Sequence, residues 1–405
     1  MAGSRRAIDR DGMRFCLSHI SCACALGRTA SEVLANGRSG FCGGLVPLVG
    51  DIPGRTLLFG SVPGELPAIG EPEYDMRANR LLLHAVGRFR RELDGFLSRY
   101  APSRIAIVLG VSNTGIDEAQ RHVDRWLDTG AKPTEMAFSE IELGTPADYL
   151  KKLLGVGGPA FAVSTACSSS AKAFASARRL MESGVADAVI VGGVDGRCRF
   201  AMNGFHSLGA LAQGTCRPLS ADRDGINLGE GVALFTMEMF DRVPAGKGAR
   251  ICLAGVGESS DAYHATAPDP DGRGAEMAMR AAMDEAGLQP ADVAYVNLHG
   301  TGTQANDSME MRAVFRIFKD SMGLDESDGR CDLVALKDKM CGMGLRIEST
   351  KSMTGHCLGA AGAIEAAIAW LYMSAGVVKG AALSNSFAFG GSNACIALTP
   401  MGGET

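Results

Sequence analysis

Cys167 is the residue whose setting most suggests covalent chemistry. It stands in "VSTACSSS" (Val163 to Ser170), between an apolar run and a helical pattern. At a strand-to-helix turn, free backbone N–H groups and the helix dipole favour the thiolate, the form that attacks a carbonyl carbon. The small neighbours Ala166, Ser168 and Ser169 leave room for a bulky substrate. A buried, inert thiol is the alternative, and the cysteine alone does not decide between the two.

Two histidines are candidate partners for this thiol. His299 follows a strand-like run in "VNLHGTGT", and His356 follows another in "STKSMTGHCLGAAG". Both runs then enter glycine-rich turns, and catalytic groups are often carried on such loops. Glycine and threonine around His299 also suit a wall along which a narrow substrate arm passes close to the backbone. A structural role for His299 stays open here, and such a role is expected for the other five histidines: His19, His84, His122, His206 and His264.

The hydrophobic pattern predicts the strands and helices that must position these side chains. Strand-like apolar runs cover residues 14–27, 104–110, 159–165 and 186–195. A first helix is expected to begin at Ser31 and Glu32 and to end at Gly37. Helical spacing also covers residues 77–100, and a small-residue helix follows Cys167 and closes at Gly184.

The order strand, reactive side chain, small-residue helix, strand occurs twice in the chain. It carries Cys167 over residues 159–195 and His356 over residues 345–391. This predicts an internal duplication rather than a short-period repeat. A connector-like stretch, "RVPAGKGAR" (Arg242 to Arg250), places the boundary between a half at 1–245 with the cysteine and a half at 246–405 with both histidines.

Composition limits the class of protein. A chain of 405 residues with 46% hydrophobic residues, 21% charged residues and 53 glycines is typical of layered α/β architecture. A net charge of −5 gives no sign of nucleic-acid binding, and the basic run in "GRFRREL" is typical of a solvated helix face. The twelve cysteines lack the paired spacing of a zinc site, so no metal is expected. We expect a cytoplasmic protein with reduced thiols, without a signal peptide or a membrane span.

Four motifs give the chain a specific resemblance. "TACSSSAKA", "HGTGT", "STKSMTGHCLGAAGAIE" and "NSFAFGGSN" occur in the order and approximate spacing of β-ketoacyl-acyl-carrier-protein synthases. The resemblance spans roughly Arg14 to Leu398 and is to the elongating condensing enzymes of the thiolase superfamily, which carry one cysteine and two histidines. It implies the thiolase fold, a duplicated five-layer αβαβα arrangement, and usually a dimer.

The resemblance also implies a decarboxylative Claisen condensation. Cys167 would take an acyl chain from the phosphopantetheine arm of an acyl carrier protein, and His299 and His356 would stabilise the enolate formed from malonyl-carrier protein. No cofactor is implied, because both substrates arrive on the carrier. The remaining implied roles are support of the histidines (Lys351 and Glu365), the oxyanion hole and gate (Cys167, Phe389 and Gly390), and pantetheine binding (Thr301 and Thr303).

The match departs from the family in three places. Between Ala375 and Ser384 a long loop of the family is missing, and the polar segment 319–344 is longer than its counterpart in the family. We expect this segment to cover the surface that the missing loop leaves exposed. The first half is similar to ketosynthases of polyene pathways such as aryl polyene clusters. In those pathways the partner of a ketosynthase is either a second copy or a related chain-length-factor subunit.

Three other classes of protein fit the sequence less well than a condensing enzyme does. A non-catalytic chain-length-factor-like subunit would lack the nucleophilic cysteine, which is present here. A degradative thiolase would carry a second cysteine as its base where this chain has "GGSN", and Cys395 beyond it is expected to point into the core. A Cys-His hydrolase would need an Asn or Asp to orient one histidine, and it would have no use for two.

Overall fold

The sheet order repeats once along the chain. The computed structural model describes residues 14–134, 136–244 and 250–400, and its large sheet has the order β11-β10-β12-β13-β9-β1-β8-β6-β4-β5. Within this sheet, each half places its strands in the order third, second, fourth, fifth, first. The two first strands pair antiparallel, Phe15 to Leu17 against Ile251 to Leu253, and so join the halves. The predicted duplication is confirmed, while the predicted boundary at 245/246 falls outside the described residues.

Within the part of the chain that the structure describes, each half contributes five strands to the large sheet. The first half contributes β1 (Phe15–Ala23), β4 (Ile105–Gly110), β5 (Ala160–Val163), β6 (Ala188–Asp195) and β8 (Gly231–Met239). The second half contributes β9 (Ile251–Ser260), β10 (Val293–Asn297), β11 (Arg346–Glu348), β12 (Ala381–Ala388) and β13 (Ser392–Pro400). A small separate sheet consists of β2 (Leu45–Ile52), β3 (Arg55–Gly60) and β7 (Leu228–Gly229).

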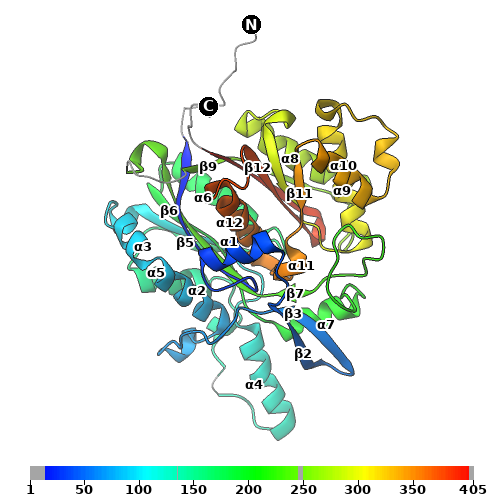
Figure 1. Ribbon diagram of the computed structural model, residues 1–405. Helices are drawn as coiled ribbons and strands as arrows, with labels where there is room; N and C mark the ends of the chain where they lie inside the picture. The colour runs from blue at the N-terminus through cyan, green and yellow to red at the C-terminus, as the bar shows by residue number, and fades with distance from the viewer. Residues whose placement is uncertain (1–13, 135, 245–249, 401–405) are drawn as a thin grey trace.

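Two helices form the central layer of the fold (Figure 1). These are α6 (Ser169–Glu182) and α12 (Ala361–Ser374), and each contacts strands of both halves. Nearly every residue of α12 is buried, as expected for a helix that is apolar on all sides. The short α1 (Ala30–Ser39) packs against α12.

The remaining helices form the outer layers. Against the first half lie α2 (Arg77–Arg88), α3 (Arg90–Leu97) and α5 (Thr145–Leu154), and against the second lie α8 (Arg273–Ala286), α9 (Gln304–Met322) and α10 (Leu333–Gly342). In Figure 1, α4 (Ile116–Thr129) projects from the bottom of the molecule, and α7 (Arg199–Ser207) contacts both α4 and β2. The short α11 (Lys351–Thr354) precedes α12. Single 3₁₀ turns occupy Pro72–Tyr74, Pro102–Arg104, Phe138–Glu140, Phe240–Arg242, Pro290–Asp292, Asp328–Arg330, Leu358–Ala360 and Phe389–Gly391.

Two glycines allow the start of α6 to lie directly on its sheet. A Cβ at Gly110 would stand 2.1 Å from the backbone nitrogen of Ser170, and one at Gly193 would stand 2.6 Å from the Ser170 Cβ. A larger residue at either position would therefore push α6 away from β4 and β6. Because Cys167 lies just ahead of this helix, the two glycines help to fix how close its thiol lies to the sheet.

Three details differ from or extend the sequence predictions. The first helix does not end at Gly37 but continues to Ser39, and Gly40 caps it in the left-handed region (φ +70°). The helical pattern over 77–100 is two helices separated at Phe89. The polar segment 319–344 is ordered: α10 buries Leu336 and Met340 and packs against α9 and β11.

Candidate active site

Cys167 occupies a strained turn between β5 and α6. Ala166, just before it, has φ +52°, which a residue with a Cβ adopts rarely and at a cost of roughly 1–2 kcal/mol. The turn is held by side chains, with the Thr165 backbone N–H donating to Ser169 Oγ at 2.9 Å. Cys167 is 7% exposed and lies two residues before α6 begins. Backbone strain of this kind is characteristic of functional sites, and here it brings the thiol to the start of the helix.

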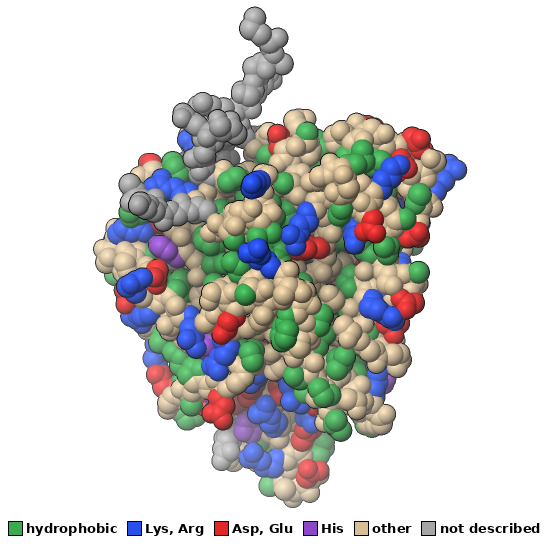
Figure 2. All heavy atoms as spheres, viewed as in Figure 1, with side chains coloured by type: hydrophobic (Ala, Val, Ile, Leu, Met, Phe, Trp, Pro, Cys, Tyr) green, Lys and Arg blue, Asp and Glu red, His purple; other side chains and the backbone are tan. Residues whose placement is uncertain are grey.

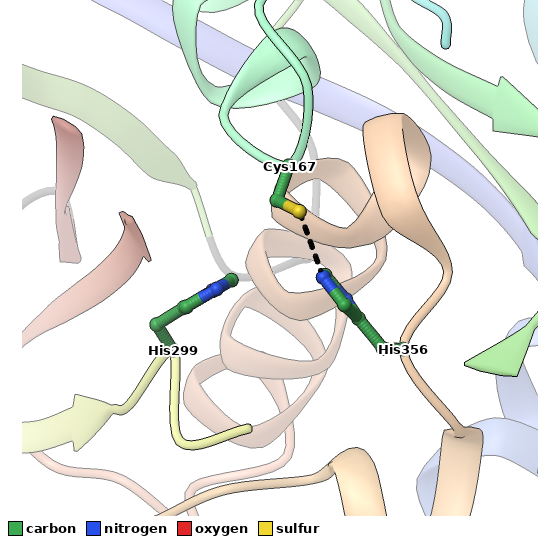
Figure 3. Close-up of side chains that lie close together, drawn as sticks. All are labelled: Cys167, His299 and His356. Carbon is green, nitrogen blue, oxygen red and sulfur yellow. Dashed lines mark hydrogen bonds between the residues drawn. The ribbon is translucent and has the colours of Figure 1, made fainter. Parts of the chain in front are cut away.

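The three reactive side chains predicted from the sequence meet at one point. Figure 3 shows the Cys167 sulfur facing the rings of both histidines. The sulfur lies 2.9 Å from His356 Nε2, and the two imidazole rings lie 5.2 Å apart at an angle of 81°. One donor atom from each residue lies within 4.8 Å of the other two. The packing of the two halves thus brings Cys167 next to His299 and His356, which follow it in the chain by 132 and 189 positions.

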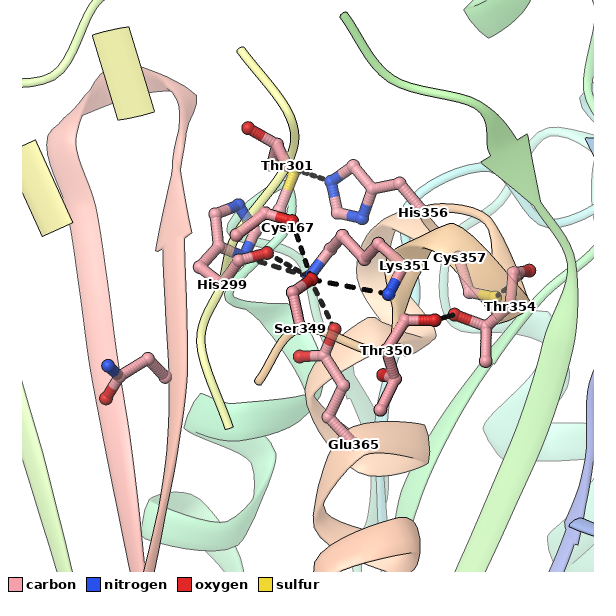
Figure 4. Close-up of polar contacts among 12 residues, drawn as sticks. Cys167, His299, Thr301, Ser349, Thr350, Lys351, Thr354, His356, Cys357 and Glu365 are labelled. Carbon is pink, nitrogen blue, oxygen red and sulfur yellow. Dashed lines mark hydrogen bonds and ion pairs between the residues drawn. The ribbon is translucent and has the colours of Figure 1, made fainter. Parts of the chain in front are cut away.

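Lys351 and Glu365 lie next to His299 (Figure 4). The Lys351 Nζ pairs with a Glu365 carboxylate oxygen, donates to the His299 carbonyl, and lies 3.4 Å from His299 Nδ1. Both side chains are almost completely buried. A buried ammonium needs a carboxylate partner, so Glu365 holds the Lys351 side chain in place beside His299.

Burial reverses the expected ionisation of the nucleophile. The sequence predicts a thiolate favoured by the helix start, but burial raises the pKa of Cys167 to about 12 despite the opposing effect of Lys351. The resting residue is therefore a thiol. The helix start and His356 can stabilise the thiolate only as it forms, with His356 Nε2 in place to accept the proton.

Both histidines are neutral. Burial, and then the positive charge of Lys351, lowers the pKa of His299 and of His356 well below the ordinary value. The sequence predicted that Lys351 would keep His356 uncharged, and burial is the larger cause. A neutral imidazole can donate one N–H while its other nitrogen accepts.

Glu310 and Asp307 are two site residues that the sequence analysis missed. Glu310 accepts hydrogen bonds from the backbone N–H groups of His299 and Gly300, both at 2.8 Å. Asp307 accepts from the N–H of Gly302 at 3.1 Å. The available signal was their spacing of three on the first turns of a helix directly after "HGTGT", which places both carboxylates on one face toward that loop.

A cavity of about 390 Å³ leads to the three reactive side chains. Thr301 and Thr303 line it, with their hydroxyl oxygens 3.0 Å apart. Thr303 also caps α9, because its hydroxyl accepts from a backbone N–H of the first turn. Residues of both halves complete the wall: Phe205, Leu208, Ile226, Gln304, Phe387 and Phe389 among others.

Phe389 lies at the wall of the cavity on a glycine-rich turn. Its ring is 5.6 Å from that of Phe205 and its side chain is 38% exposed. The two glycines that follow it adopt positive φ angles, +81° at Gly390 and +73° at Gly391. The Gly390 N–H donates to the carbonyl of Ala265 at 2.8 Å, so this turn rests on the segment after β9.

The sulfur and the two imidazole nitrogens are also donors that a soft divalent metal uses. The same three groups, protonated and neutral, equally suit acyl transfer. The expectation of no metal stays a prediction. Cys395, the other cysteine of interest, is buried in β13 as expected.

The surface carries charges of both signs. Figure 2 shows Lys and Arg interspersed with Asp and Glu on the face in view. Among the described residues, no helix has both the length and the apolar composition needed to cross a membrane.

The chain matches two family models and resembles several known proteins. Residues 79–240 match the family model "Beta-ketoacyl synthase, N-terminal domain", and residues 251–382 match "Beta-ketoacyl synthase, C-terminal domain". The chain is 34% identical over 323 residues to Nodulation protein E of Rhizobium meliloti, covering 73% of this chain and 75% of that protein. It is also 34% identical over 272 residues to 3-oxoacyl-[acyl-carrier-protein] synthase 2 of Staphylococcus aureus, covering 65% of this chain and 62% of that protein.

A solved structure extends the likeness over almost the whole chain. It is the "Ketosynthase (ApeO) in Complex with its Chain Length Factor (ApeC) from Xenorhabdus doucetiae", with a TM-score of 0.83 and 36% identity, covering 96% of this chain and 99% of that one. The fold expected from the sequence is therefore confirmed. The chain belongs to the β-ketoacyl synthase family and is an acyl-transferring condensing enzyme of the thiolase fold.

Proposed function

We propose that Cys167 carries the growing acyl chain and that His299 and His356 drive a decarboxylative condensation with malonyl-carrier protein. The observation that carries this proposal is the meeting of one thiol and two neutral imidazoles at a single cavity. In the first half-reaction the sulfur attacks the thioester carbonyl of an acyl chain on the phosphopantetheine arm of a carrier protein. A carbon–sulfur bond to Cys167 forms, the bond to the arm breaks, and the thiol proton passes by way of His356 to the departing arm.

In the second half-reaction, malonyl-carrier protein enters the same cavity. N–H groups of His299 and His356 donate to its thioester carbonyl, so the electrons left behind by CO2 are held as an enolate. The carbanion attacks the acyl-cysteine carbonyl, a carbon–carbon bond forms, and the bond to sulfur breaks. The departing thiolate of Cys167 then takes up one proton from solvent and is again a thiol. The product is a β-ketoacyl chain, two carbons longer, on the carrier.

The surrounding residues take supporting parts in this proposal. Backbone N–H groups of Cys167 and Phe389 bind the oxyanion of each tetrahedral intermediate, and Gly390 lets the Phe389 turn move. Thr301 and Thr303 hold the pantetheine arm by their hydroxyls. Lys351, held in place by Glu365, orients His299 and adds to the burial that keeps both histidines uncharged. No cofactor is required, because the carrier protein delivers both substrates.

For the pathway we propose chain elongation of the polyene type, such as aryl polyene synthesis, in the cytoplasm. The likeness to a ketosynthase solved with its chain length factor supports this over primary fatty-acid synthesis. The twelve cysteines are free, which suits a reducing compartment.

We also propose that the chain pairs with a related chain-length-factor-like subunit. The β5 strand is the edge of the large sheet, and its Phe161 side chain is 37% exposed. An unpaired strand edge is a template for pairing with another chain. The partner strand would continue the sheet beyond β5, at the end that supplies Cys167.

The test of this function is intact-mass analysis after incubation with carrier proteins bearing saturated and polyunsaturated acyl chains. Wild-type protein is expected to gain the mass of one acyl chain, fastest with the polyunsaturated set, and Cys167→Ala to gain none. A Cys395→Ala control should load like wild type, because Cys395 does not line the cavity. Absence of loading from every carrier in the wild type would favour a non-catalytic, chain-length-factor-like subunit. Equal loading of Cys167→Ala would refute the assignment of the nucleophile.

A further inference from the structure

Asp195 is a buried carboxylate beside the active site that the condensation chemistry leaves unused. It is the last residue of β6 and has no exposed surface. Its Oδ1 accepts from the backbone N–H groups of Ser112 at 2.9 Å and Asn113 at 3.0 Å. Its Oδ2 accepts from the Ser112 hydroxyl at 2.6 Å and from the Gly359 N–H at 2.7 Å. Four donors on one buried carboxylate indicate a built anchor rather than a chance contact.

The anchor joins two segments that are far apart in sequence. Ser112 and Asn113 lie in the turn after β4, which ends at Gly110, whereas Gly359 comes three residues after His356. The second segment is tight: Leu358 has φ +49°, and a Cβ at Gly359 would stand 2.7 Å from Asp195 Oδ2. The hydrogen bond that the Gly359 N–H donates to Asp195 therefore holds a strained backbone in place.

His356 itself lies between this anchor and a second one. Its backbone N–H donates to the carbonyl of Asn227 at 2.7 Å, and its carbonyl accepts from the Gly229 N–H at 3.0 Å, so this segment fixes the backbone of His356 on one side. On the other side, the first fixed backbone group after the Leu358 turn is the Gly359 N–H on Asp195. The position of the imidazole relative to Cys167 thus depends on both.

The charge of Asp195 acts against the nucleophile. Burial is the main cause of the raised pKa of Cys167, and the negative charge of Asp195 raises it further. A carboxylate that disfavours the thiolate is not placed there to activate the cysteine. Its hydrogen bonds to the His356 segment offer the reason for its presence.

We propose that Asp195 is a positioning residue for His356: its carboxylate ties the His356 turn to the turn after β4 and keeps the imidazole directed at the reacting thioester. This inference rests on the proposed function of His356. Replacing the carboxylate with an amide removes the negative charge and introduces N–H donors where donors already point. Two effects follow. A less firmly held His356 slows decarboxylation, and a more easily ionised Cys167 speeds alkylation of the thiol.

The test is Asp195→Asn, with two rates measured on the purified protein. Decarboxylation of malonyl-carrier protein is expected to fall by about tenfold or more, since a misplaced oxyanion donor loses most of its effect. Alkylation of Cys167 by iodoacetamide near neutral pH is expected to rise by about threefold, because loss of the neighbouring negative charge lowers the pKa of the thiol. A merely structural role would lower both rates together, in step with the loss of folded protein.

Two further variants complete the design. Glu238→Gln is the matched control, because Glu238 is equally buried, in β8, and does not line the cavity; both rates should match wild type. Ser112→Ala removes one donor to Asp195 and one acceptor of the Gly359 N–H, at 3.3 Å, so decarboxylation should fall moderately. Without the Ser112 hydroxyl the pKa of Asp195 rises above about 6, so alkylation should lie between the wild-type and the Asp195→Asn rates.

Unchanged decarboxylation in Asp195→Asn, or a parallel fall of both rates, would overturn the inference. If that variant does not fold, Ser112→Ala decides, and wild-type decarboxylation there would overturn it equally. Failure of the proposed function is distinguishable, because wild-type protein would then release no CO2 from malonyl-carrier protein at all.

Discussion

At the scale of single residues, the two histidines are not equivalent. His356 Nε2 contacts the Cys167 sulfur, whereas the Nδ1 of His299 faces the Lys351 ammonium. His356 can therefore serve both half-reactions: as proton acceptor during loading and as hydrogen-bond donor during decarboxylation. His299 has a part only in the second.

This difference predicts the behaviour of His356→Ala. Decarboxylation of malonyl-carrier protein should fall by about 10²–10³, the usual loss when one oxyanion donor is removed. Loading of Cys167 should be largely spared, falling by at most about tenfold, because the start of α6 still stabilises the developing thiolate. The measurements are CO2 release and intact-mass loading, with His19→Gln in β1 as control. Equal losses in both would mean that His356 is an obligatory base for Cys167.

At the scale of elements, α9 holds the His299 loop through a carboxyl group of unusual affinity for protons. Burial raises the pKa of Glu310 to about 7, against an ordinary value of 4.5. The folded protein therefore binds a proton at Glu310 between pH 4.5 and 7 that the unfolded chain releases. The contribution of this group to stability is complete below pH 4.5 and is lost as the pH rises to 7.

Glu310→Gln should remove this pH dependence. Across the window from pH 4.5 to 7, the wild-type free energy of unfolding should lose about 1.4 kcal/mol per pH unit more than that of the variant. Urea unfolding at a series of pH values measures the difference. Parallel curves for the two proteins would show that Glu310 ionises at an ordinary pKa in the folded state.

The turn that carries Phe389 offers a matched pair of glycines. Alanine at Gly390 or Gly391 would adopt a positive φ, at a cost of roughly 1–2 kcal/mol in each case. Only at Gly391 would the new Cβ meet a neighbour, the Asp261 Cβ at 2.9 Å, whereas at Gly390 it would meet open space.

Gly391→Ala should therefore displace the turn, and Gly390→Ala should only strain it. We expect a larger fall in melting temperature and slower loading of long acyl chains in Gly391→Ala. Thermal unfolding and the mass-based loading rate check this. The same loss in both variants would mean that backbone strain, rather than contact with Asp261, sets the position of the turn.

At the scale of the whole molecule, we expect the β5 edge of the large sheet to govern assembly. Co-expression with a chain-length-factor-like subunit should yield a one-to-one complex, and Phe161→Asp should prevent it by placing a charge at the β5 edge. Val334→Asp on α10 is the control, since its side chain is also 37% exposed. Light scattering after size exclusion gives the masses, and a complex that survives Phe161→Asp would exclude this edge as the interface.

Local patterns in the sequence were enough to predict the duplicated fold and the three reactive side chains that meet at the cavity. Local sequence patterns predict strands, helices and the turns between them. The repeated order of strand, reactive side chain and helix could therefore be recognised in the sequence. Gly37 shows the limit of such patterns. A glycine inside a helix resembles a helix end until its tertiary neighbour is known, and here the Tyr372 hydroxyl lies where a Cβ would come within 3.0 Å.

The contacts within the site and the ionisation of its residues could be known only from the tertiary structure. Which histidine touches the sulfur, that Glu310 holds the His299 loop, and that Asp195 reaches a turn 164 positions away all depend on how the halves pack. The pKa of Cys167 shows the physical reason most clearly. The pull of a helix start is local and can be read from the sequence, but desolvation depends on every atom around the sulfur, and here it is the larger effect.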